Sequence, residues 1–154
     1  MEISVIFRTL AIFACILLSN GCSLFAEKVA LDHITVDVDP RANNDTPIAI
    51  DFVATADSVL EERLKGTTAA QWFEQRDQLQ KDYPGQLNIW SLELVPGQFM
   101  ALNDIPLKGQ RSHGLLVFAS YNTPGAHRLV LQKQSSIWLK LEGKGMRLLD
   151  SEGQ

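Results

Sequence analysis

Apolar and polar side chains alternate along two stretches of the chain, HITVDVDP (33–40) and PIAIDFVAT (47–55). Alternation with a period of two predicts β-strands that have one buried and one solvated face. The polar stretch between them, RANNDTP, is rich in residues typical of turns. We therefore expect a hairpin whose strands are joined by an exposed polar loop. The apolar positions of the two strands are Ile34, Val36, Val38, Ile48, Ile50 and Phe52.

A helical insertion is predicted next, near residues 58–83. Ser58 and Glu61 have the spacing of a capping box, and Gly66 is a typical helix end. These signals predict a short first helix and leave room for a longer second one.

The second helix is predicted to begin at a capping box of Thr68 and Gln71 and to end before Pro84. Its larger side chains fall largely on one face, so we expect the helix to lie against a sheet. Core packing is the expected role of Trp72 and Phe73, with a ligand site as the alternative. The face carries Ala69, Trp72, Phe73, Leu79 and Tyr83.

Short strand-like segments return from residue 87 onward. They are LNIWSLELV, GLLVFASY, HRLVLQKQ, SIWLKL and GMRLL, and the first two are separated by the turn Pro96-Gly97-Gln98 and a mixed polar and apolar stretch. LLVFA is apolar on both faces, which predicts a central strand covered by a second sheet on one side and by the helices on the other. The pattern predicts a mainly β fold: a two-sheet β-sandwich with a short helical insertion.

The composition changes this picture little. The chain is 45% hydrophobic and 21% charged, which is enough apolar material for one globular core. The formal net charge is -4 and no cluster of Lys or Arg is present, so we expect no nucleic-acid partner.

The first residues predict export. An apolar run, TLAIFACILL (9–18), follows Arg8 and has the length of a signal-peptide h-region. It is shorter than the roughly 20 residues that a membrane-spanning helix needs. We expect a signal peptide over residues 1–21.

Cys22 is the predicted lipidation site. Gly21 precedes it, and the junction resembles the lipobox of bacterial lipoproteins, with Ser19 and Asn20 at positions where the lipobox usually has other residues. A buried free thiol at Cys22 and acylation at Cys15 are the alternatives. Acylation would anchor the chain firmly in a membrane, and Ser23 at the next position implies sorting to the outer membrane. We expect a lipidated tether over residues 22–30 and a folded domain over residues 31–150.

The sequence offers few candidates for chemistry. His33, His113 and His127 lack metal-ligand spacing, so we expect them on the surface or in loops. The acidic stretch from Asp37 to Asp45 lacks the glycine and the final glutamate of an EF-hand, which favours a solvated loop over a calcium site. No G-x-S-x-G, HExxH or phosphate-loop motif occurs. We expect a protein that is not an enzyme and that needs no metal or cofactor.

The order of these features resembles a known family. The chain is similar to the TssJ-type outer-membrane lipoproteins of bacterial type VI secretion systems. The features that carry the resemblance are a lipidated cysteine, two strands around a polar loop, a helical insertion, LELVPGQ, GLLVFASYNTPGAHR and a final SIWLKLEG. The resemblance spans residues 31–149. The second strand departs from the family, which often has a more basic, tyrosine-containing strand where this chain reads IAIDFVATAD.

The resemblance implies a transthyretin-like sandwich that hangs from the periplasmic face of the outer membrane. It also implies binding to the periplasmic region of the inner-membrane protein TssM. In that family the loop joining the first two strands contacts the partner. We expect this loop to contribute little to the core and to tolerate substitution. Its residues here are Arg41, Ala42, Asn43, Asn44, Asp45 and Thr46.

Two other functions remain open. A generic periplasmic β-sandwich lipoprotein that binds a small ligand or assists envelope assembly should have an apolar pocket between sheet and helices. An acylated enzyme should have a cluster of titratable groups in a cleft.

Overall fold

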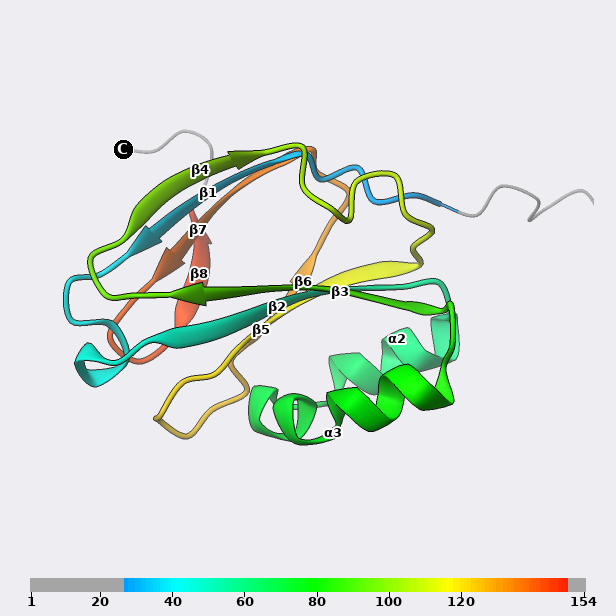
Figure 1. The fold of residues 1–154 in the computed structure, drawn as a ribbon, viewed down its shortest axis with the longest axis horizontal. Coiled ribbons are helices and arrows are strands. Elements are labelled where there is room, and N and C mark those ends of the chain that lie inside the picture. The colour runs from blue at the N-terminus through cyan, green and yellow to red at the C-terminus, as the bar shows by residue number, and fades with distance from the viewer. Residues whose placement is uncertain (1–26, 150–154) are drawn as a thin grey trace, which may run out of the picture.

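The first alternating stretch forms strand β1 (His33–Val38), which lies inside a four-stranded sheet (Figure 1). The computed structural model describes residues 27–149. β1 is antiparallel to β4 and parallel to β7, and the order of the sheet is β4-β1-β7-β8. The sequence did not predict β4, because a five-residue run, FMALN, carries too little alternation to distinguish a strand from a connection. The other strands of this sheet are β4 (Phe99–Asn103), β7 (Ser136–Leu141) and β8 (Met146–Leu149).

The second alternating stretch forms β2 (Ile48–Thr55) in a second four-stranded sheet, with the order β3-β2-β5-β6. All neighbours in this sheet are antiparallel. The two sheets face each other across one apolar core, which confirms the predicted β-sandwich with a short helical insertion (Figure 1). The other strands of this sheet are β3 (Leu87–Leu94), β5 (Gly114–Ala119) and β6 (Arg128–Leu131).

The predicted hairpin of the first two strands is wrong. β1 and β2 belong to different sheets, and the chain between them crosses from one sheet to the other. The predicted faces are correct, because the alternating apolar side chains of both strands are buried in the shared core. Alternation fixes which side of a strand is buried, but it does not choose the neighbouring strand.

The LLVFA segment forms the inner strand β5, as predicted. Leu115 and Val117 point into the core between the sheets, whereas Leu116 and Phe118 belong to a second apolar cluster under the helices. β5 is therefore covered on both faces.

Helices α2 (Ser58–Lys65) and α3 (Ala69–Asp82) cover the outer face of the sheet that contains β2 (Figure 1). The N-cap of α2 is Asp57 and not Ser58, because the Asp57 carboxylate accepts a hydrogen bond of 2.7 Å from the backbone N–H of Leu60. The predicted end at Gly66 and the capping box of α3 are both confirmed.

Trp72 packs in the core of this helical layer, as expected. Its ring stacks on Phe118 with a centroid distance of 5.0 Å, and its side chain is fully buried. The indole N–H donates to the Oδ2 atom of Asp51 at 2.8 Å. Arg76 donates to the same oxygen at 2.8 Å, and the Ser91 hydroxyl donates to Oδ1 at 2.6 Å. A buried carboxylate on β2 therefore fastens α3 to the sheet.

The folded part of the chain begins before residue 31. Lys28 forms a β-bridge with Arg111, and Val29 and Leu31 are buried in the main core. The expected tether over residues 22–30 is therefore too long at its C-terminal end. The predicted signal peptide and Cys22 lie outside the described residues. Within residues 27–149, neither helix has the length and apolar character that a membrane crossing requires.

Candidate functional site

The predicted contact loop, residues 41–46, follows β1 at one end of the sandwich (Figure 1). It contains the short 3-10 helix η2 (Ala42–Asp45), in which Asn43, Asn44 and Asp45 have φ values of 49°, 56° and 61°. Positive φ is strained for most residues but is tolerated by Asn and Asp. The run Asn-Asn-Asp is therefore the local reason that the chain can turn here.

Asn43 anchors the loop from inside. Its side chain is 1% exposed; the amide Nδ2 donates to the carbonyl of Pro47 at 3.1 Å, and Oδ1 accepts from the backbone N–H of Asn122 at 2.6 Å. The hydroxyl of Thr46 donates to the Asn43 carbonyl at 2.6 Å and accepts from Nδ2 of Asn122 at 2.8 Å. These bonds join the loop to the connection between β5 and β6.

The expectation that the whole loop is exposed and tolerant is corrected by this geometry. Ala42 and Asn43 are buried, so they belong to the fold rather than to a free surface. The exposed residues are Arg41, Asn44 and Asp45. The Arg41 guanidinium lies 3.6 Å from the Asp45 carboxylate, and both side chains face solvent. This charged pair and Asn44 are therefore the exposed part of the loop.

Two further loops complete the same end of the sandwich. The hydroxyl of Tyr121 points at the carbonyls of Glu142 and Gly145 in the turn between β7 and β8, and burial raises the pKa of this phenol above its usual value. The ring of His127 stacks on Tyr121 with a centroid distance of 4.8 Å, and its Nε2 donates to the Thr123 carbonyl at 2.7 Å. The sequence did not predict these contacts, which join residues far apart along the chain.

The acidic stretch before the loop neutralises a lysine. Lys140 on β7 places its Nζ 2.6 Å from Asp39 and 2.9 Å from Asp37, and these hydrogen bonds, led by the one to Asp39, raise the pKa of the ammonium group. No group of three or more metal-ligating side chains occurs within residues 27–149. Two of the carboxylates considered for calcium, Asp37 and Asp39, thus have a lysine as their partner in the fold.

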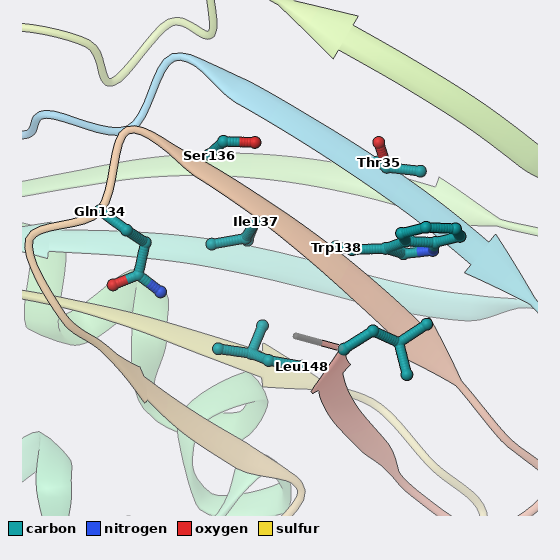
Figure 2. A pocket seen from close by; sticks show the side chains of 7 residues that line it. Thr35, Gln134, Ser136, Ile137, Trp138 and Leu148 are labelled. Atoms are coloured by element: carbon teal, nitrogen blue, oxygen red, sulfur yellow. The ribbon is translucent and has the colours of Figure 1, made fainter. Parts of the chain in front are cut away.

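A surface hollow of about 370 Å³ lies on the sheet that contains β1, beside β7 and β8 (Figure 2). None of its lining side chains is titratable, so they offer no general acid or base. The hollow is also not the apolar pocket between sheet and helices that a ligand-binding lipoprotein would have, because Trp72 and Phe118 pack in that space. It is lined by Thr35, Gln134, Ser136, Ile137, Trp138, Leu148 and Leu149.

Comparison with known proteins finds a likeness in structure rather than in sequence. No protein-family model matches the chain, and no curated protein matches it. The T6SS lipoprotein TssJ1 from Pseudomonas aeruginosa superimposes with a TM-score of 0.60 at 16% identity, over 76% of this chain and 92% of that chain. Serratia marcescens Lip, a membrane-bound component of the type VI secretion system, gives a TM-score of 0.53 at 14% identity, over 78% and 96%.

A third match is a chain in the structure described as the T6SS protein TssM C-terminal domain from EAEC. Its TM-score is 0.55 at 13% identity, over 76% of this chain and 95% of that chain. The chain therefore has the TssJ-type fold, over nearly the whole length of these solved structures.

Proposed function

We propose that this protein is a lipoprotein anchored through Cys22 in the outer membrane, where it binds the periplasmic region of a TssM-type protein and so tethers a type VI secretion membrane complex. One observation carries the proposal: the chain has the fold of lipoproteins from that system, over most of its length. The protein is a structural adaptor, not an enzyme.

The positions of the two ends of the sandwich support an adaptor. The N-terminal segment enters at the start of β1 and the 41–46 loop lies beyond its end, so the strand separates them (Figure 1). The six residues of β1 span about 20 Å at a rise of about 3.3 Å each. A membrane anchor and a protein contact at these places would not compete for the same surface.

The tether keeps the domain close to the membrane. Lys28 is already fixed by its bridge to Arg111, so only the residues from Cys22 to Lys28 connect the anchor to the fold. Such a segment reaches at most about 20 Å when it is fully extended. The anchor therefore joins the domain at the end opposite the 41–46 loop, which leaves the loop end free for a partner that comes from the inner membrane.

Lipidation is tested by replacing the proposed acylation site. Cys22→Ser should abolish incorporation of labelled palmitate and move the protein from the membrane fraction to the soluble periplasmic fraction, because the acyl chains supply the anchoring energy. Cys15→Ser is the matched control and should leave labelling unchanged. Labelling that survives Cys22→Ser would remove the anchor from the proposal.

Partner binding is tested with a variant that changes only exposed loop residues: Arg41→Ser, Asn44→Gly and Asp45→Gly. Glycine keeps the positive φ values, so the melting temperature should change little. Binding to the purified periplasmic C-terminal domain of the cognate TssM, measured by calorimetry, should weaken about tenfold or more.

Asp104→Gly is the matched control for this variant. Asp104 also has a positive φ, of 53°, but it follows β4 at the opposite end of the sandwich. The Asp104→Gly variant should bind TssM with native affinity. If the loop variant also binds with native affinity, the loop is not part of the contact. If the native protein does not bind, the TssM proposal itself is contradicted.

A further inference from the structure

The turn between β3 and β4 is a rigid feature that the proposed function does not yet use. The backbone N–H of Gln98 donates to the Val95 carbonyl at 3.1 Å, and the Gln98 side chain accepts from the Val95 N–H at 3.0 Å. Gly97 has a φ of 79°, as the third position of a Pro-Gly type II turn requires. A β-turn brings its two end residues, here Val95 and Gln98, within about 7 Å, and Phe99 follows directly as the first residue of β4.

This turn is bonded to the chain that leads into the 41–46 loop. The N–H of Gly97 donates to the Asp39 carbonyl at 3.1 Å, and the N–H of Val38 donates to the Gln98 carbonyl at 2.9 Å. A Cβ atom built on Gly97 would lie 3.9 Å from the Cα of Pro40. The turn and the loop are therefore parts of one continuous end of the sandwich.

Two large apolar side chains face solvent, one at the start of the turn and one directly after it. Val95 is 49% exposed and Phe99 is 64% exposed. Within residues 27–149, the other exposed large apolar side chains are Val59 on α2 and Val130 on β6. Exposed aromatic and aliphatic side chains that sit on a rigid support are typical anchors of protein interfaces.

We propose that Val95 and Phe99 form the apolar centre of the contact with the partner protein, while Arg41 and Asp45 form its polar rim. This inference rests on the proposed function, because the occupant is an apolar segment of the same TssM-type partner. Three carboxylates, those of Asp37, Asp39 and Asp45, share two cations, Lys140 and Arg41, so this group of charges is net negative and disfavours an anionic lipid surface. The turn also lies at the end of the sandwich away from the N-terminal segment (Figure 1).

The division of roles follows from the chemistry of the two groups. The exposed Arg41–Asp45 pair remains hydrated and contributes little affinity by itself. Removing the side chains of Val95 and Phe99 from water on binding is favourable in proportion to the apolar area that is covered. The turn therefore supplies affinity, and the charged loop supplies orientation.

The test uses the full-length chain, purified in detergent, with Val95→Ser and Phe99→Ser together. The control is the double variant Val59→Ser and Val130→Ser, which removes the other two exposed apolar side chains. All variants should keep the native circular dichroism. The turn variant should bind the cognate TssM periplasmic domain about tenfold or more weakly, and the control should bind with native affinity.

Each other outcome has a defined meaning. If the native protein binds and the turn variant binds equally well, the turn contact is wrong while the proposed function stands. If the control weakens binding as much as the turn variant does, the effect is general and the inference is overturned. If the native protein sediments as a dimer and only the turn variant is monomeric, the occupant is a second copy and not the partner. A native protein that does not bind overturns both proposals.

Discussion

Two buried polar side chains, Asp51 and Asn43, organise two different regions of the molecule. Asp51 lies on β2 under the helices and is bound by three side chains, from Trp72, Arg76 and Ser91. Asn43 lies in the loop before β2 and is bound by two backbone groups, those of Pro47 and Asn122. The first site joins a helix to a sheet, and the second joins two loops.

The difference separates stability from function. The Asp51 carboxylate is fully buried, and its partner Trp72 belongs to the apolar cluster under the helices, whereas Arg76 is 35% exposed. The Asn43 site has the same degree of burial but holds exposed neighbours, Asn44 and Asp45, in place. Changes at Asp51 should therefore affect only folding, whereas changes at Asn43 should affect both folding and the surface that we propose for the partner.

The largest expected effect is that of Asp51→Ala. The substitution leaves the indole N–H of Trp72 buried without an acceptor and removes the charge that holds Arg76. Hydrogen bonds to a charged group contribute about 1.5 to 3 kcal/mol each, and three are lost, so we expect a loss of about 4 kcal/mol or more in the free energy of unfolding by urea.

Asp77→Ala is the matched control. Its carboxylate lies 3.8 Å from the same arginine, but the side chain is 85% exposed. Surface pairs contribute about 0 to 1 kcal/mol, so the control should be close to native stability. Equal losses in the two variants would show that Asp51 does not fasten the helix.

The sequence predicted the elements well wherever the signal is local. The alternation in β1 and β2, the capping box of α3 and the doubly apolar β5 are all short-range patterns, and all are confirmed. The error at the start of α2 is also local, because Asp57 and Ser58 are adjacent and both are good N-cap residues.

What the sequence did not predict depends on contacts between distant residues. The parallel pairing of β1 with β7 joins positions about a hundred residues apart, and neither strand carries a sign of the other. The burial of Asn43 likewise depends on Asn122, a residue 79 positions away, so the polar run around Asn43 gives no local sign of it. Composition alone does not distinguish an asparagine that faces solvent from one that ties two loops together.

A smaller but more informative effect is expected for Asn43→Ala, compared with Asn44→Ala. Both substitutions place alanine at a positive φ, which costs about 1 to 2 kcal/mol. Only Asn43→Ala also removes buried hydrogen bonds and leaves backbone groups of the neighbouring loop unsatisfied, at a further cost of about 1 to 3 kcal/mol. The difference between the two urea unfolding free energies therefore isolates the anchor. Because the anchor positions the exposed loop, Asn43→Ala should also weaken partner binding more than Asn44→Ala at a temperature where both variants are folded.

If the two variants lose the same stability, Asn43 acts only through its backbone conformation and the loop does not depend on its side chain.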